Sequence, residues 1–226
     1  MKTLLLQLIG MQAWGTSRFD LRDTNADPSK SGVIGLEAAA FGYSRDETTW
    51  IRPSLEDLTR MTMCVRVDRE GQLFHDFHTV NGIIRNDGGS GGSIISDRYY
   101  LADAAFIVAL GGEDWLVDAL AKAIADPVYP LFLGRRCCPP CAPVFLGVSD
   151  LEPQDALKSL PVKRRDYEMR NHPKDKPWQV RLVSEDLFGA IRYDVPLSLK
   201  RREHSPRRII SRFWTVPSEL VVRDNL

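Results

Sequence analysis

The order of the apolar segments is the feature that most restricts the fold of this chain. Short apolar or alternating runs, which are typical of strands, recur along the first 150 residues, and two other runs have the spacing of helices. Strands are predicted at residues 4–9, 60–68, 100–110 and 144–148, and helices at residues 29–42 and 114–125. The sequence therefore predicts an α+β domain in which two helices pack on one face of an antiparallel sheet.

A glycine-rich segment lies between the second and third of these strands. Residues 88–93 contain four glycines, and such a stretch is costly to order and adds nothing to a core. Residues 77–100 are therefore predicted to form a projecting β-hairpin rather than an idle surface linker, because its arms carry aromatic, histidine and arginine side chains. With this insertion, the order of elements over residues 1–150 matches a ferredoxin-like (RNA-recognition-motif-like) sheet.

Residues 151–226 are richer in charge and proline, and they are predicted to form a smaller β-rich C-terminal region. The whole chain has a formal net charge of zero, yet residues 161–226 carry 15 Lys or Arg against 9 Asp or Glu. This asymmetry indicates either a basic patch or an ordinary solvated face. The basic runs at residues 163–165, 200–202 and 207–208 are therefore only candidate contacts with RNA or DNA.

The predicted helix at residues 29–42 begins in a way that favours a bound anion. Ser29 and Ser31 have side chains that cap helical N–H groups, Gly32 leaves the backbone accessible, and Lys30 adds a mobile positive charge. The segment is thus a candidate phosphate site at a helix N-terminus. The alternative is a serine-capped helix that only packs against the core.

Two further motifs suggest contacts with a nucleic acid. Arg135 and Arg136 follow a glycine and precede prolines that stiffen the loop, a placement that suits guanidinium contacts with phosphate, although the pair is equally compatible with solvated arginines. Trp14 lies just after the first predicted strand, where it either stacks on a base or packs in the core.

The cysteines and histidines give weaker signals. Cys137, Cys138 and Cys141 include a C-x-x-C spacing, but no fourth zinc ligand lies nearby, and we predict no bound metal and no cofactor. His75 and His78 are three residues apart on a predicted hairpin arm and do not form a catalytic pair. No apolar run approaches the roughly 20 residues of a membrane helix, so we expect a cytoplasmic protein with no membrane partner.

Taken in order, several motifs resemble those of the CasD family, the type I-E members of the fifth CRISPR-associated protein family. They lie at residues 8–15, 28–36, 76–80, 100–106, 133–140 and 143–147. The resemblance covers residues 1 to about 150 densely and the remainder loosely.

This resemblance implies a subunit of Cascade, an RNA-guided surveillance complex of antiviral defence. In that family a ferredoxin-like domain with a projecting thumb binds the 5′ handle of the CRISPR RNA and caps one end of the backbone. The expected partners are the CRISPR RNA, the other backbone subunits and the large subunit, with target DNA reached indirectly through the complex. Residues 77–100 would be the thumb.

The family resemblance also implies that the chain is not an enzyme. Members of another subtype cleave precursor CRISPR RNA, so an endoribonuclease remains the alternative, with Tyr43, Lys30 or His78 as conceivable participants. The candidate RNA-binding residues are Gln12, Trp14, Arg18, Ser29, Lys30, Ser31, Gly32, His78, Thr79, Arg85, Arg98, Tyr99, Arg135 and Arg136.

Overall fold

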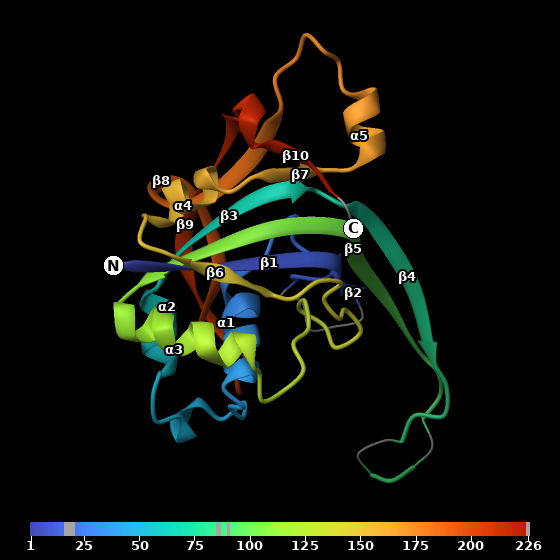
Figure 1. Cartoon of the computed structure of the whole chain (residues 1–226). Coiled ribbons are helices and arrows are strands. Elements are labelled where there is room, and N and C mark those ends of the chain that lie inside the picture. The colour runs from blue at the N-terminus through green and yellow to red at the C-terminus, as the bar shows by residue number, and fades with distance from the viewer. Residues whose placement is uncertain (16–20, 85–86, 90, 225–226) are drawn as a thin grey trace.

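The structure is a computed structural model that describes residues 1–15, 21–84, 87–89 and 91–224. Its main element is a curled, largely antiparallel sheet in the order β6-β1-β5-β3-β8-β9 (Figure 1). The strands are β1 (Lys2–Gln12), β2 (Leu21–Arg22), β3 (Thr62–Arg69), β4 (Gln72–Val80), β5 (Ile94–Gly112), β6 (Phe145–Ser149), β7 (Val162–Arg164), β8 (Gln179–Ser198), β9 (Glu203–Thr215) and β10 (Val221–Arg223). The helices are α1 (Lys30–Ala40), α2 (Leu55–Arg60), α3 (Asp114–Ala125), α4 (Pro153–Ser159) and α5 (Asp166–Asn171), with short 3₁₀ turns at Glu47–Thr49 and Ser218–Leu220.

Helices cover both faces of the sheet. In Figure 1, α1, α2 and α3 lie on one side and α4 lies on the other. Leu4, Leu6 and Leu8 of β1 belong to the large core under α1 and α3, whereas Leu5 packs with Leu157 of α4 in a second cluster. Because successive side chains of a strand point to opposite faces, a strand covered on both faces needs apolar residues at nearly every position. The continuous apolar run of β1 follows from this arrangement.

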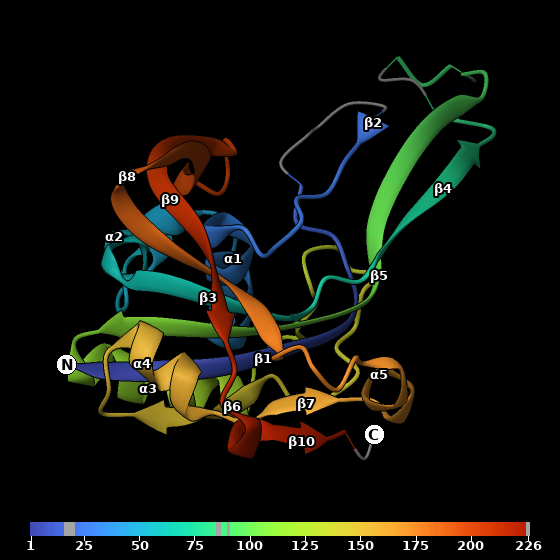
Figure 2. The same cartoon turned by 90° about the horizontal axis from the view of Figure 1, so that it is seen from above.

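The long strand β5 leaves the sheet and pairs with β4 in a hairpin. The pairing runs from Gln72 opposite Ala102 to Val80 opposite Ile94. Figures 1 and 2 show this hairpin extending away from the rest of the molecule. A hairpin therefore lies where the glycine-rich segment predicts one, although its pairing begins several residues before residue 77.

The C-terminal region is β-rich, but its largest strands extend the main sheet. Residues Cys64 to Val67 of β3 pair with β8, and β8 pairs with β9. Among the described strands, only β7 and β10 form a separate two-stranded sheet, which packs around a small cluster of Val162, Val180 and Val216. The sheet therefore continues across residue 150, and the division into two domains stays a prediction.

The short helices are among the elements that the sequence analysis missed. Helix α2 spans only six residues, too few to show a helical period, although Ser54 and Asp57 form a capping box at its start. Helix α3 has the predicted bounds, because its apolar stripe extends over three turns. Within the part of the chain that the structure describes, no helix combines the length and the apolar character needed to cross a membrane.

Glu37 is a buried carboxyl group in the middle of α1. Its side chain is about 1% exposed, and neither oxygen has a hydrogen-bond partner among the described residues. Burial raises the pKa of Glu37 to about 8, with Lys30 opposing the shift. The folded protein therefore holds this group protonated at neutral pH.

This burial predicts a decline in stability with rising pH. Between a pKa of about 4.5 in the unfolded chain and about 8 in the folded chain, only the folded state keeps the proton, so stability falls through this window and levels off above it. We expect the free energy of unfolding to decrease by roughly 2–3 kcal/mol from about pH 6 to pH 8. Glu37→Gln should lack this part of the decline in denaturant titrations, whereas equal pH profiles for the two proteins would contradict the assignment.

Candidate functional site

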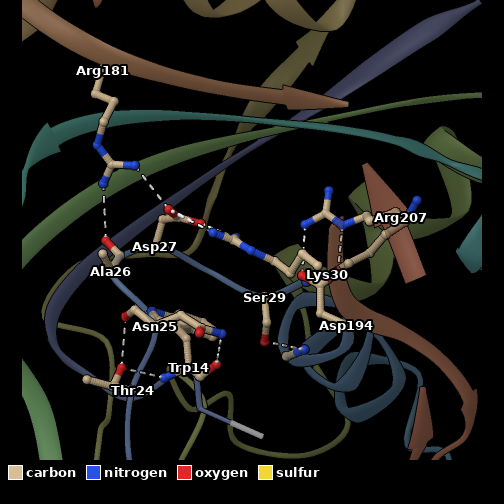
Figure 3. A network of polar contacts seen from close by, with 12 residues as sticks. Trp14, Thr24, Asn25, Ala26, Asp27, Ser29, Lys30, Arg181, Asp194 and Arg207 are labelled. Atoms are coloured by element: carbon tan, nitrogen blue, oxygen red, sulfur yellow. Dashed lines mark hydrogen bonds and ion pairs between the residues drawn. The ribbon is translucent and has the colours of Figure 1, made fainter. Parts of the chain in front are cut away.

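The start of α1 is capped as predicted, but the anion that lies against this N-terminus is a carboxylate of the protein itself. The Ser29 hydroxyl accepts a hydrogen bond from the Gly32 backbone N–H at 3.3 Å. The Lys30 backbone N–H donates to Oδ2 of Asp194 at 2.9 Å (Figure 3). Asp194 is fully buried. The expectation of an RNA phosphate at this helix start is therefore corrected, because a carboxylate of β8 already occupies it.

Lys30 is not the mobile cation that the sequence suggests. Its side chain is about 5% exposed, and its Nζ donates to the Met61 carbonyl at 2.7 Å and to Glu185 at 2.9 Å. Arg207 binds the same cluster, donating to Asp194 at 2.7 and 2.9 Å and to Glu185 at 3.2 Å. The network ties the β8–β9 hairpin to the start of α1 and leaves the Lys30 amine no access to a ligand.

A second buried carboxylate holds the segment before α1. Asp27 is about 2% exposed and forms ion pairs with Arg181, at 3.1 Å, and with Arg192. Arg181 also donates to the Ala26 carbonyl (Figure 3) and to Glu70. The side-chain hydrogen bond with Glu70 raises the pKa of Arg181 further above its usual range, and the bond to Asp27 adds to this shift. The arginines of β8 therefore position the approach to α1.

Trp14 and Gln12 are core residues. The Trp14 side chain is about 1% exposed and Gln12 is fully buried. The Gln12 Oε1 accepts from the indole Nε1 of Trp14 at 2.9 Å, and its Nε2 donates to the carbonyls of Leu8 and Ala104. Of the two interpretations of Trp14, the structure supports packing, and the proposed RNA contact of Gln12 is corrected because its amide is fully engaged.

The same packing explains the glycine at position 32. A Cβ atom there would lie 2.7 Å from Cε3 of the Trp14 ring. The sequence predicted that Gly32 leaves the backbone open for a ligand. In the structure, the missing Cβ instead makes room for the indole ring of Trp14.

The arginine turn depends on Gly134. This residue has φ of +89°, and a Cβ atom would lie 1.8 Å from the Ala13 carbonyl oxygen. Arg135 then donates to the carbonyls of Arg22 and Asp23 at 2.8 and 3.1 Å, and its guanidinium lies 4.9 Å from the Tyr100 ring centroid. Arg135 thus uses several of its N–H donors to hold neighbouring loops together.

A groove of about 920 Å³ brings together three segments that the sequence analysis singled out. It is lined by the loop after β1, by the start of α1 and by the arginine turn, and the β8–β9 hairpin supplies a further wall. None of the described residues that line it is acidic. The predicted residues that reach this groove are Trp14, Ser29, Ser31, Gly32, Arg135 and Arg136.

The groove also contains basic residues that the sequence analysis did not select as site residues. They are Arg22, Arg45, Arg202 and His204. Arg22, Arg45 and Arg136 are exposed, and their side chains make no hydrogen bond or ion pair with another described residue. The run at residues 200–202 was a visible signal for Arg202, whereas nothing in the sequence places Arg45 beside the arginine turn. The result is a basic surface suited to an anionic chain.

The remaining predicted residues lie on the β4–β5 hairpin or outside the described chain. His78 approaches Asp76 at 3.7 Å, Tyr99 stacks on His75 at 4.6 Å between ring centroids, and Arg98 donates to Ser96 at 3.2 Å. These hairpin residues do not line the groove. Thr79 is exposed on the same hairpin, and Arg18 and Arg85 lie outside the described residues.

The conceivable nuclease residues do not share a site. Tyr43 lines the groove and donates to the Arg52 carbonyl at 2.6 Å, and burial raises the pKa of its hydroxyl. Lys30 is buried against Glu185, and His78 lies on the hairpin. No common set of contacts joins the three side chains.

The clustered cysteines lie between the arginine turn and β1. Cys138 is buried with its Sγ 4.0 Å from that of Cys137, and burial raises the pKa of Cys138 to about 12. Cys141 is exposed, and its backbone N–H donates to the Ile9 carbonyl. Among the residues that the structure describes, no group of three His, Cys, Asp or Glu side chains is placed to hold a metal ion.

Comparisons with known proteins agree with one another. Residues 3–217 match the family model of the CRISPR-associated protein Cas_Cas5. The chain is 37% identical to the "CRISPR system Cascade subunit CasD" of Escherichia coli (strain K12) over 171 residues, which are 68% of this chain and 75% of the relative. Among solved structures, a chain of a "CRISPR RNA-guided surveillance complex" matches with a TM-score of 0.80 and 34% identity, covering 97% of this chain and 92% of that one. A "Crystal structure of Cas protein" matches with a TM-score of 0.71 and 36% identity, covering 97% of both chains.

Proposed function

The chain belongs to the Cas5 family of CRISPR-associated proteins, and from that premise we propose that it is a Cascade component that binds and caps the 5′ handle of the CRISPR RNA. It acts in the cytoplasm without catalysing a reaction. Its partners are the CRISPR RNA, the other backbone subunits and the large subunit, through which it meets target DNA. The handle-binding role explains the groove better than a packing role does.

The observation that carries this proposal is the basic groove, whose described lining residues include no acidic side chain. A single-stranded RNA offers regularly spaced phosphates and unstacked bases, so its binding site combines free cations with exposed aromatic faces. Arg22, Arg45 and Arg136 supply exposed guanidinium groups. Tyr129, which is about 50% exposed, supplies an aromatic face in the same groove.

The hairpin supports a role in assembly. We propose that β6-β1-β5-β3 with α1 and α3 forms a ferredoxin-like unit, from which residues 77–100 project as a thumb. The hairpin exposes Leu73, Phe77 and Ile95 at 66%, 61% and 50%. Such apolar side chains suit insertion between the guide RNA and its target beside the thumbs of neighbouring subunits.

A binding and cleavage experiment separates this function from its alternative. The purified chain is incubated with handle-bearing RNA, with a scrambled RNA of equal length and with precursor repeat RNA. We expect preferential binding of the handle and recovery of the precursor intact. Specific cleavage of the precursor would favour an endoribonuclease, and equal affinity for handle and scrambled RNA would contradict handle recognition.

A further inference from the structure

A bulge in β8 presents two large apolar side chains to solvent. Glu185 and Ala190 both pair with Ile209, so the four residues between them loop out of the strand. Leu187 is 84% exposed and Phe188 is 94% exposed. Adjacent large apolar side chains with this exposure are unusual on a monomer and are typical of an interaction site.

Two hydrogen bonds and the close approach of Gly189 to the neighbouring strand hold the bulge in one shape. The Asp186 carboxylate accepts a hydrogen bond from the Phe188 backbone N–H at 2.9 Å. Arg208 donates to the Gly189 carbonyl at 3.2 Å, and a Cβ atom at position 189 would lie 2.2 Å from the Ile209 carbonyl oxygen. A preformed loop loses little conformational entropy on binding, which suits an anchor that enters a pocket.

The surroundings of the bulge extend this apolar surface and give it a positive rim. Ile191 and Tyr193, which are 54% and 64% exposed, follow the bulge on β8. Ile191 lies opposite Arg208 in the register, and Arg212, whose side chain is 66% exposed, approaches Asp186 at 3.5 Å. The apolar centre therefore has arginines at its edge, as in a protein interface with an apolar core and a polar rim.

We propose that this bulge docks into an apolar pocket with an acidic rim on another protein subunit of the assembly. This inference rests on the proposed function in one respect: it takes the partner to be a subunit of the same complex. Phe188 and Tyr193 present aromatic faces, but Leu187 and Ile191 beside them are aliphatic and offer no face on which a base stacks. The Asp186 carboxylate also disfavours an RNA phosphate. Arg208 and Arg212 have the charge that would complement carboxylates at the edge of the partner's pocket.

The test uses the complex reconstituted from all subunits of the chain's own system together with its CRISPR RNA. Leu187→Ser/Phe188→Ser is compared with Ile51→Ser, which removes a side chain that is 92% exposed elsewhere on the molecule. In native mass spectrometry the double variant should lose one protein subunit, with its occupancy reduced at least about tenfold, as expected for an interface hot spot. Ile51→Ser should retain the full set of subunits, and Arg212→Glu should weaken the same subunit's association.

A photo-reactive benzophenone side chain at position 188 identifies what the bulge contacts. A cross-link to the subunit that the double variant loses would support the proposal. Cross-linking to RNA, or full retention of every subunit by the double variant, would overturn it. The affinity of the unaltered chain for handle RNA and for scrambled RNA is measured in parallel. If the chain binds both RNAs equally while the double variant still loses the subunit, the docking site is supported and the proposed handle-binding function is contradicted.

Discussion

Replacing Arg22, Arg45 and Arg136 together with glutamate is expected to weaken binding of handle RNA at least about a hundredfold, because hydrogen bonds to charged groups contribute about 1.5–3 kcal/mol each. The three guanidinium groups line one groove and make no hydrogen bond or ion pair with another described residue. Their substitution therefore removes cations from the ligand site without breaking a hydrogen bond or ion pair between described residues. Fluorescence anisotropy with a labelled handle RNA measures the change in affinity.

A matched variant controls for the change in net charge. Lys122, Lys174 and Lys176 are exposed and lie outside the groove, so changing these three residues to glutamate alters the charge by the same amount. We expect this variant to keep most of its affinity, because exposed charges that do not line the binding groove are largely screened by salt. Equal losses in the two variants would show that only the overall charge matters and would contradict a groove-specific site.

Asp194→Ala is expected to lower the free energy of unfolding by about 3–5 kcal/mol, the cost of removing one partner from a buried ion pair. Asp194 is fully buried and accepts hydrogen bonds from the Lys30 backbone and from Arg207. Its loss leaves the Arg207 guanidinium without that partner and the first N–H of α1 without an acceptor. Urea denaturation followed by circular dichroism measures the difference.

Glu203→Ala provides the comparison on the same hairpin. Glu203 is exposed and pairs with Arg201 at 3.4 Å, so its removal should cost less than about 1 kcal/mol. A destabilisation by Asp194→Ala that is no larger than this would contradict the view that the Asp194 network secures α1. Because β8 and β9 form one wall of the groove, the destabilised variant should also lose handle affinity.

Local rules predicted the main elements because their signals lie within a few residues. The apolar stripe defined α3, and the Ser29 cap at the start of α1 follows from a preference that acts over three residues. The carboxylate that accepts from the start of this helix was not predicted, for a different reason. It belongs to Asp194, which is 164 residues away in the chain, and no local pattern indicates that this carboxylate reaches Lys30.

In the candidate site, too, the sequence predicted the locally determined features but not the contacts between distant segments. The arginine turn at Arg135 and Arg136 was recognisable because glycine and proline restrict the backbone beside it. Arg45 and Arg202 come from separate loops, and only the folded sheet brings them into the groove. Conversely, Gln12 and Trp14 looked accessible because they follow a strand, whereas the packing of Trp14 against α1 buries both.

The salt dependence of handle binding tests most directly whether this groove holds the RNA backbone. Each phosphate contact to a single strand contributes about 0.7 to the slope of log K against log salt concentration. The unaltered chain should therefore show a slope steeper by about 2 than the variant in which Arg22, Arg45 and Arg136 are glutamate. Equal slopes for the two proteins would mean that these arginines do not meet phosphates, and would contradict the account.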